Sequence, residues 1–594
     1  MTRRAGIALF WCSTLLTSTF SSSVRALSLS NSSSSVKSVA SPPSQTNLVR
    51  PHAIIVGAGP IGLATALTLA NFHSYDVTVY EKAPYDDYSS FDPSKAFLYL
   101  ISSRGQEFTT MFPELQTKLM ERGVPSSTPF VRISEDINTL VPEEEGRSYL
   151  SRNADFGEEE VETDANDDKS QSKDKKKQEI MGYWIPRHDM NLILYETIQE
   201  IGKKKKGDKT VGKITCHFGV FCVDMHVSDD QASIQVVTRD TSNGKESMNT
   251  ANLVVAGDGN KSKVREILSA QNPTSSSFKA FDSKFNPKKF KVRQWTSPST
   301  ALRLKALQLP PKCPIPQAGA ESYISKGHIS YFFRGKNKGP RNYLQLGCLP
   351  MKDDDLIRPA NVVTRPDHDI WKLTEGEDVR KYMQNCFPRM QFQPEAEGGI
   401  ISDAEWERFT KAKGLSFPFC QYSPGLVVSS SGDNNEGEAL DCGVVLLGDA
   451  AHSFPPDTGQ GINAGLSDVV YLDRVLKNDG QSIRLNKALR QYEKKRAPET
   501  KALIRLARFG FPYQYSQSHY IDRIRKMLCL VNFAGRILLN KVTAGLAPKP
   551  AVAMAMDKGV TYRQVMRKAD AMTALFSSLC IVLVAKKMMS SFFL

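Results

Sequence analysis

Three short apolar runs, far apart along this 594-residue chain, each lead directly into a turn that contains glycine. They cover residues 52–56, 253–256 and 443–447, and each is apolar at consecutive rather than alternate positions. Runs of this length and pattern are typical of buried strands. After the first turn, Leu, Ala and Thr recur at helical spacing over residues 63–71. The pattern predicts an α/β fold in which strand, turn and helix follow one another.

The first turn, residues 57–62, reads Gly-Ala-Gly-Pro-Ile-Gly. Its first glycine permits the tight bend, its second lets the backbone approach a pyrophosphate, and its third lets helix and strand pack closely. The N–H groups at the helix start also favour an anion. A second strand, residues 77–80, ends at Glu81, where a carboxylate can accept hydrogen bonds from ribose hydroxyls. The combination predicts a dinucleotide site, with an ordinary tight loop as the alternative.

The other two turns indicate which dinucleotide is bound. Residues 257–259 are Gly-Asp-Gly and precede a helix whose first turn closes with Arg265. Gly448-Asp449 follows the third run, at the carboxyl end of a strand, where open α/β sheets bind ligands and where the acid can hold a ribityl hydroxyl. Residues 459–465 then form a glycine-rich approach to a helix whose first N–H groups suit an electron-rich flavin ring. Together the three turns predict an FAD site.

A different pattern occupies the middle of the chain. Polar and apolar residues alternate over residues 322–325, 329–333 and 342–346, which is typical of strands with one buried face. We therefore expect a mostly antiparallel sheet between about residues 280 and 430.

Taken together, these motifs resemble the signature of the single-component FAD-dependent aromatic hydroxylases, over about residues 51–585. Within that family the likeness is nearest to the kynurenine 3-monooxygenase group, through the turns already described, the Ser103-Arg104-Gly105 triplet, Phe387-Pro388 and a hydrophobic C-terminal tail. The resemblance implies a Rossmann-type FAD-binding domain interleaved with a mostly antiparallel β-sheet substrate domain, plus C-terminal helices. It further implies NADPH as reductant, O₂ as co-substrate, and a small aromatic substrate, with kynurenine as the first candidate.

The resemblance and the motif chemistry together give a set of expected FAD contacts, while no catalytic residue is assigned. Arg187 enters because residues 185–192 match the family's arginine-plus-leucine helix, although a surface arginine at a helix start is the alternative. The expected contacts are Gly57, Gly59, Pro60, Ile61, Gly62, Glu81, Lys82, Arg104, Arg187, Asp258, Gly448, Asp449, Gly461, Ile462 and Asn463.

One departure from the family pattern concerns the residues expected to bind the substrate. Kynurenine hydroxylases are expected to carry an arginine for the substrate carboxylate, and a nearby tyrosine, after the segment that corresponds to residues 123–125. Here residues 126–129 are Ser-Ser-Thr-Pro, and Arg132 is a weak substitute. A membrane-bound flavin epoxidase of an isoprenoid and a non-catalytic FAD-binding protein therefore stay open.

The expected domain organisation is discontinuous, with a disordered charged insertion at residues 155–179, acidic first and then rich in lysine. The expected parts are a targeting segment at 1–47, an FAD-binding domain at 51–130, 180–270 and 440–480, a substrate domain at 280–430, a basic helical region at 481–570 and a probable membrane anchor at 571–594.

Other classes of site are not indicated. Ten cysteines and nine histidines are scattered without metal-ligand spacing, which argues against a metal enzyme. The net charge of +14 is concentrated in the basic helical region, but no nucleic-acid motif accompanies it. Basic residues that alternate with apolar ones suit an anionic membrane surface better.

The two ends of the chain predict membrane association. Arg3-Arg4 precedes an apolar stretch to Phe20, small-residue cleavage spacing at 24–26 and a Ser-rich, acid-free stretch to Asn47, as in a secretory signal or a bipartite targeting segment. The apolar run 571–585 is shorter than the about twenty residues of a bilayer span, so we expect a spanning or interfacial anchor, with a buried terminal helix as the alternative. Family analogy gives the mitochondrial outer membrane as one possible location.

Overall fold

We analysed a computed structural model of the chain. It describes residues 50–592, except for a number of segments and single positions. Those gaps are residues 91–96, 128, 135–146, 149–181, 206, 209, 271–272, 317–321, 338, 340, 431–440, 478–483, 511–512, 514, 516–519 and 558. The expected targeting segment and the expected disordered insertion therefore lie outside the described residues.

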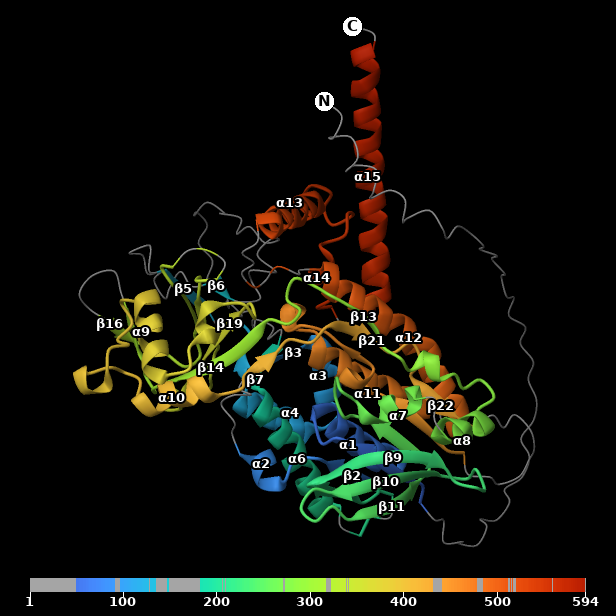
Figure 1. The fold of residues 1–594 in the computed structure, drawn as a ribbon. Helices are drawn as coiled ribbons and strands as arrows, with labels where there is room; N and C mark the ends of the chain where they lie inside the picture. The colour runs from blue at the N-terminus through green and yellow to red at the C-terminus, as the bar shows by residue number, and fades with distance from the viewer. Residues whose placement is uncertain are drawn as a thin grey trace, which may run out of the picture. The chain divides into compact units, whose positions relative to one another are not determined.

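The three apolar runs form adjacent parallel strands of one sheet (Figure 1). They are β1 (His52–Val56), β12 (Leu253–Ala256) and β23 (Gly443–Leu446), and every residue of the last two is buried. The full order is β22-β23-β12-β1-β2-β8. The outer strands are β2 (Asp76–Glu81) and β8 (Ile214–Phe218), both parallel to β1, and the antiparallel β22 (Val427–Ser429). Because the central strands are parallel, their carboxyl ends and the three turns meet at one edge of the sheet.

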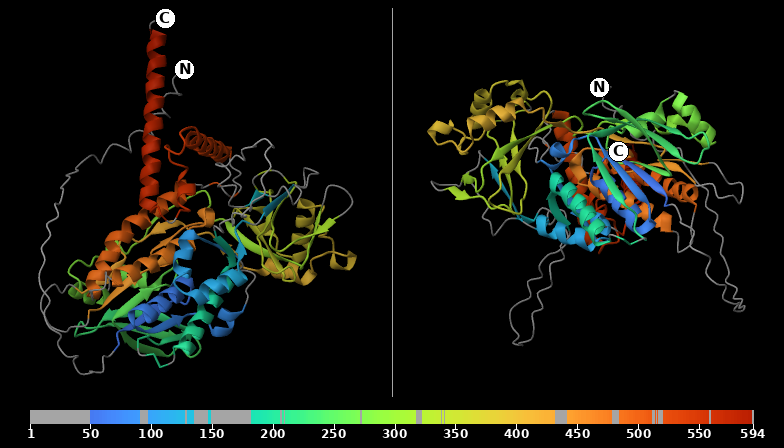
Figure 2. Two further views of the ribbon diagram at one scale, coloured as in Figure 1. Left: turned by 180° about the vertical axis from the view of Figure 1, so that it is seen from behind. Right: turned by 90° about the horizontal axis from the view of Figure 1, so that it is seen from below.

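Helices and smaller sheets cover this six-stranded sheet. Helix α1 (Pro60–His73) packs against α11 (Gly461–Lys477) and α6 (Arg187–Lys204). A three-stranded sheet lies beside β1 and β2, as Figure 2 also shows. Its strands are β9 (Val220–Val227), β10 (Ile234–Asp240) and β11 (Glu246–Ala251), and two helices follow β12, namely α7 (Lys263–Ser269) and α8 (Pro273–Phe281).

Another small sheet brings a helix start to the same region. Strand β3 (Leu98–Ser102) pairs with β7 (Gly182–Pro186), which also pairs with β4 (Val124–Pro125). Helices α3 (Ser103–Thr109) and α6 begin where β3 and β7 end. Helix α4 (Pro113–Arg122) packs on α6.

The predicted central sheet is present and has its own apolar core. Its order is β20-β14-β19-β18-β17-β5-β6, and all pairs are antiparallel except β5 with β17. The strands are β20 (Leu415–Ser416), β14 (Arg303–Leu309), β19 (Arg358–Thr364), β18 (Gln345–Cys348), β17 (Ser330–Arg334), β5 (Pro129–Ser134) and β6 (Arg147–Ser148). Helices α9 (Gly376–Cys386) and α10 (Asp403–Lys411) pack together beside it (Figure 1). The α/β fold class is thus confirmed.

Two of the alternating patterns gave different elements from those expected. Residues 322–324 form β16, which pairs only with β15 (Pro314–Pro316) in a separate two-stranded ribbon. The strand expected over 342–346 begins only at Gln345, because residues 341–342 form a turn. Alternation describes a one-sided environment and does not specify which neighbour a strand pairs with.

Four helices close the described chain: α12 (Leu485–Phe509), α13 (Tyr520–Val542), α14 (Ala551–Met554) and α15 (Tyr562–Phe592). None of the helices in the described part of the chain combines the length and the apolarity needed to cross a bilayer. The transmembrane tail predicted at 571–594 is therefore not supported. The apolar run there is too short, and the helix continues directly into Lys586-Lys587.

Candidate active site

The first two turns pack backbone against backbone at the sheet edge. Gly57 has φ +98°, and a Cβ there would lie 2.7 Å from the Gly257 carbonyl oxygen. A Cβ at Gly62 would lie 1.9 Å from the Gly57 carbonyl oxygen, far inside van der Waals contact. Side chains are excluded at both positions, so the β1–α1 turn keeps its N–H groups accessible at the start of α1.

Glu81 points back toward this turn. One of its carboxylate oxygens accepts a hydrogen bond from the Ala58 N–H at 2.8 Å, and the other accepts from the Ala83 N–H at 3.0 Å. The acid is thus fixed beside the glycine turn, where a ribose would lie. Lys82, also an expected contact, is exposed, and its ammonium lies 5.6 Å from the centre of the Phe221 ring.

The first and third turns are locked together by one apolar side chain. A Cβ at Gly448 would lie 2.9 Å from Ile61, and one at Gly465 would lie 2.6 Å from the same side chain. Ile61 therefore fits between the start of α1 and the start of α11, next to Pro60, the first residue of α1. The glycines at these positions bring the two helix N-termini close together.

The second turn is joined to the third by Arg265. Its guanidinium donates to the Ala450 carbonyl oxygen at 2.5 Å and to that of Asn260 at 2.7 Å. Asp258 caps α7 through one carboxylate oxygen, which accepts from the N–H of Lys263 at 2.6 Å. Burial raises the pKa of Asp258, and its other oxygen has no hydrogen-bond partner among the described residues.

Asp449 lies at the carboxyl end of β23 in an enclosed place that water can still reach. Desolvation raises its pKa, while the interactions with His452, Arg187 and Arg265 act in the opposite direction. Tyr99 of β3 also lies within reach of Arg187 and Asp449, and burial raises the pKa of its phenol to about 12. Asp449 and Arg187, predicted independently from distant motifs, are therefore neighbours in the folded chain.

Two of the expected contacts, Asn463 and Arg104, join distant segments of the protein. Asn463 accepts from the Ser102 N–H at 3.0 Å and donates to the Leu100 carbonyl oxygen at 2.8 Å, so it ties α11 to β3. Arg104 donates to the carbonyl oxygens of Asp557 and Val560, both at 2.7 Å. The C-terminal segment thus covers the start of α3, a contact for which the Arg104 triplet gave no signal.

The motif analysis missed a buried ionic cluster under the third turn. Asp468 of α11 accepts from the Gly448 N–H at 2.9 Å, contacts the His452 ring at 2.8 Å and pairs with Arg496 of α12. Burial acts to raise the pKa of Asp468, but Arg496 and His452 outweigh it and lower the pKa to about 2. Asp468 therefore stays ionised and fixes Gly448. Helical spacing from Gly461 could have suggested that Asp468 is buried, but nothing local links it to Arg496.

These residues fit FAD. The helix starts of α1 and α11 offer N–H groups to a pyrophosphate and a flavin ring. A Cβ at Gly259 or Gly461 would meet no atom within 4 Å, so the turns border open space. The free oxygen of Asp258 and the water-accessible Asp449 supply acceptors for hydroxyl groups. Across the described residues there is no group of three or more side chains suited to hold a metal ion.

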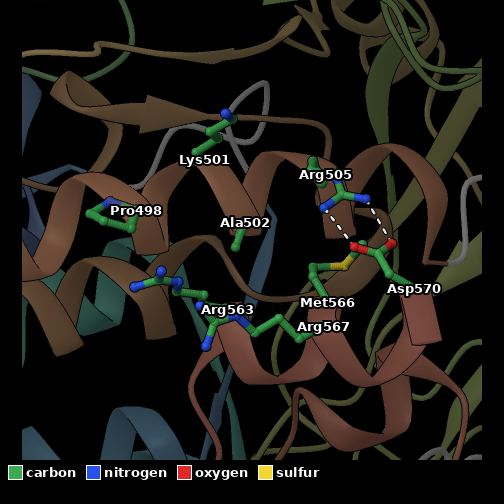
Figure 3. A pocket seen from close by; sticks show the side chains of 8 residues that line it. All are labelled: Pro498, Lys501, Ala502, Arg505, Arg563, Met566, Arg567 and Asp570. Atoms are coloured by element: carbon green, nitrogen blue, oxygen red, sulfur yellow. Dashed lines mark hydrogen bonds and ion pairs between the residues drawn. The ribbon is translucent and has the colours of Figure 1, made fainter. Parts of the chain in front are cut away.

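A separate hollow of about 320 Å³ lies between α12 and α15 (Figure 3). Pro498, Ala502 and Met566 supply its apolar part, and basic side chains surround it. Arg505 faces Asp570 across it in an ion pair with an N–O distance of 2.8 Å. None of its lining residues belongs to the three turns, so we do not place the cofactor there.

Comparison with known proteins supports the cofactor assignment. Residues 440–507 match the FAD binding domain family, and residues 55–85 match the NAD(P)-binding Rossmann-like domain family. A kynurenine 3-monooxygenase from Drosophila willistoni is 39% identical over 205 residues, which cover 31% of this chain and 41% of that protein. A 3-(3-hydroxy-phenyl)propionate/3-hydroxycinnamic acid hydroxylase from Burkholderia cenocepacia is 44% identical over 64 residues, which are 11% of this chain and 12% of that one. The chain thus aligns with less than half the length of these curated relatives.

Solved structures of similar fold include PqsL, a probable FAD-dependent monooxygenase from Pseudomonas aeruginosa. It is 16% identical with a TM-score of 0.44, over 81% of this chain and 100% of that one. A 2-methyl-3-hydroxypyridine-5-carboxylic acid oxygenase is 14% identical with a TM-score of 0.45, over 83% and 98% of the two chains. The three turns, their convergence at one sheet edge and the matched segments support FAD and NAD(P)H as cofactors, and parts of the chain are similar to FAD-dependent aromatic hydroxylases.

Proposed function

We propose that this protein is a monooxygenase that consumes NAD(P)H and inserts one oxygen atom of O₂ into an aromatic substrate. The observation that carries the proposal is the convergence of three FAD-type turns beside a second sheet that has its own core. A small sheet joins the two parts: β13 (Arg293–Trp295), β21 (Cys420–Tyr422) and β24 (His452–Ser453). The chain passes through β13 before it enters β14 and through β21 after it leaves β20, so the junction is a place where substrate and flavin can meet.

The protein's own residues position and enclose the reactants. When bound, FAD supplies the oxygen chemistry and NAD(P)H the reducing equivalents, so the chain has to orient the cofactor and keep the site dry. In the proposed complex Glu81 accepts from the ribose hydroxyls and Asp449 from a ribityl hydroxyl. Arg187 places a positive charge beside Asp449 and thereby favours its ionised form. The C-terminal segment, held by Arg104, limits access of water from the side of α3.

Kynurenine is the substrate to test first, because four of the relatives carry the name kynurenine 3-monooxygenase. The segment where a carboxylate-binding arginine is expected bears no such residue. Ser126 is buried there, and its N–H donates to the Gly182 carbonyl oxygen. Arg132 lies in β5, opposite Phe332 in the seven-stranded sheet. Recognition of a substrate carboxylate would therefore have to use Arg132 or a cation elsewhere in the chain.

The deciding experiment measures NADPH oxidation by the FAD-loaded full chain, with and without kynurenine, and follows 3-hydroxykynurenine by chromatography. Stimulated oxidation that is coupled to product supports the full proposal. An Asp449→Ala variant is the matched control, because it removes one acceptor and should weaken FAD binding without changing the fold. Stimulation by other aromatic compounds alone would retain the monooxygenase and exclude kynurenine.

Two alternatives give distinct results in the same assay. A flavin epoxidase would oxidise NADPH in response to an isoprenoid and leave aromatic rings unchanged. A non-catalytic FAD-binding protein would hold FAD stoichiometrically and show no substrate-stimulated oxidation of NADPH or NADH. The enzyme proposal is abandoned if no aromatic compound stimulates turnover in protein that is fully loaded with FAD.

We also propose that the protein associates with membranes through α13, lying in the plane of the surface. Ile521, Ile524, Leu528 and Val531 are exposed at spacings of three and four residues, as on one face of a helix. Arg536, near the other end of α13, is buried and donates to Thr573 of α15. An apolar face turned outward, with Arg523, Arg525 and Lys526 on the same helix, suits an anionic lipid surface. In a flotation assay with phosphatidylserine vesicles, the wild type should float with the vesicles and the Leu528→Glu variant should not. Met248→Glu, which changes an exposed apolar residue outside α13, is the control and should float like the wild type. Equal flotation of all three proteins would exclude α13 as the membrane-binding helix.

A further inference from the structure

A second buried carboxyl lies in the loop between β24 and α11, and no motif accounts for it. Asp457 belongs to the short helix η7 (Pro456–Thr458), two residues before Gly459, and its exposed fraction is 6%. One carboxyl oxygen accepts from the Ser299 hydroxyl at 2.5 Å. The other oxygen is fully buried and has no hydrogen-bond partner among the residues that the structure describes. A buried polar atom without a partner is costly, so it calls for an explanation.

Asp457 lies at the junction between the two sheets. Its partner Ser299 sits in the turn between β13 and β14, which Ser297 and Thr300 close through a hydrogen bond of 3.0 Å between their backbones. On the other side its own loop leads into α11, whose start borders the predicted flavin position. The carboxyl group is therefore contributed by the FAD side and held by the first residues of the substrate side.

The charged and titratable groups around Asp457 leave it without a cation of its own. Ser299 faces it from the β13–β14 turn, and Cys420 of β21 is close enough to interact electrostatically. Arg508 of α12 acts on Cys420, and its guanidinium lies 5.2 Å from the centre of the Trp295 ring. Burial raises the pKa of Asp457 to about 7, with the Ser299 hydrogen bond acting in the opposite direction. Asp468, equally buried but paired with Arg496, shows the contrary shift.

We propose that Asp457 is a catalytic proton acceptor for the aromatic substrate, and that its free carboxyl oxygen takes the proton from a hydroxyl group on the ring. This inference rests on the proposed monooxygenase function. The O–H bond of the substrate breaks, its electron pair stays on the ring system, and a new O–H bond forms on Asp457. Only a proton moves from the substrate to Asp457, so neither group is oxidised or reduced and the step needs no oxidant. A ring with more electron density is more readily attacked by an electrophilic oxygen.

The test is the pH dependence of kcat/KM for the coupled turnover of a set of phenols between pH 5.5 and 8.5. Kynurenine, whose ring carries no hydroxyl, is the comparison substrate and should show no inflection that depends on Asp457. In the wild type kcat/KM should rise with pH through an inflection near pH 7. Asp457→Asn keeps the shape of the side chain but cannot accept a proton, so kcat/KM should fall about 100-fold or more and the inflection should disappear. Asp457→Glu, which keeps the carboxyl, should restore an inflection.

Ser299→Ala serves as the directional control. It removes a donor that favours the ionised carboxyl, so the inflection should move to higher pH. Infrared difference spectra between wild type and Asp457→Asn give a readout that does not need turnover, since the carboxylic acid band should titrate near neutral pH.

The outcomes separate the two proposals. A coupled wild-type enzyme whose pH profile is unchanged in Asp457→Asn overturns the role of Asp457 and leaves the monooxygenase intact. Absence of any aromatic-stimulated turnover in the FAD-loaded wild type overturns both. Loss of FAD from Asp457→Asn would make Asp457 a cofactor contact, and this also overturns the proposal.

Discussion

The six-stranded sheet and the seven-stranded sheet are built in different ways. At the edge of the first, contacts between segments 200 or more residues apart are made by backbone and glycine, as at Gly57 and Gly257. In the second, strands such as β14 and β19 are held by register and by side chains of a common core. The cofactor region therefore tolerates few residues at few positions, whereas the substrate region accepts many sequences that keep its volume and alternation. Sequence motifs therefore reveal the cofactor region and do not reveal the substrate region.

The sharpest way to test this contrast is to add one methyl group to each region. Gly62→Ala would place a Cβ 1.9 Å from the Gly57 carbonyl oxygen, so the β1–α1 turn must move and FAD binding should be lost. Gly347→Ala in β18 would place a Cβ 3.5 Å from the Phe332 ring, which is an ordinary contact, and FAD content should stay normal. The FAD content of the two purified variants and their thermal unfolding measure these effects. If both variants kept the same FAD content and unfolded at the same temperature, the contrast between the two sheets would be contradicted.

The next largest effect is expected from the ionic cluster under the third turn. Arg496→Met leaves the buried Asp468 without its cation, so we expect a loss of about 3–5 kcal/mol in unfolding free energy and weaker FAD binding. Arg505→Met breaks the half-exposed pair with Asp570 and should cost about 1 kcal/mol or less. Urea unfolding of both variants gives the comparison. Similar losses would mean that Asp468 is stabilised by other groups.

Asp457 and Asp468 should respond to pH in opposite directions. Asp468, with a pKa lowered to about 2, binds fewer protons than in the unfolded chain, so its stabilisation is present above about pH 4 and is lost as the pH falls toward 2. Asp457, with a pKa raised to about 7, binds more protons when folded, so stability decreases as the pH rises from about 4 to 7, by up to about 4 kcal/mol. Unfolding curves of Asp457→Asn should lack this decrease. The same slope in the variant would exclude Asp457 as its source.

The smallest effect concerns Lys82, a residue that the sequence placed at the cofactor. Its exposed ammonium lies over the Phe221 ring, a contact worth about 0.5–1 kcal/mol. Lys82→Ala should therefore lower stability slightly and leave FAD affinity within about twofold of the wild type. Glu81→Ala, next to it, should weaken binding much more, because Glu81 faces the glycine turn. Titration of the apoproteins with FAD separates the two.

Local sequence determined the three buried strands, the glycine turns and the acids at strand ends, because each depends on backbone geometry within a few residues. It also indicated an antiparallel sheet from alternation, but it could not decide that residues 322–324 leave that sheet for a ribbon with β15. Tertiary structure alone decided that Asn463 and Arg104 join segments of the protein, and that Arg496 pairs with Asp468. Such contacts depend on which distant helices meet, and that is set by packing of the whole core rather than by spacing along the chain. The same reason explains why Asp457 carries no motif: its environment is made by burial and by Ser299, 158 residues earlier.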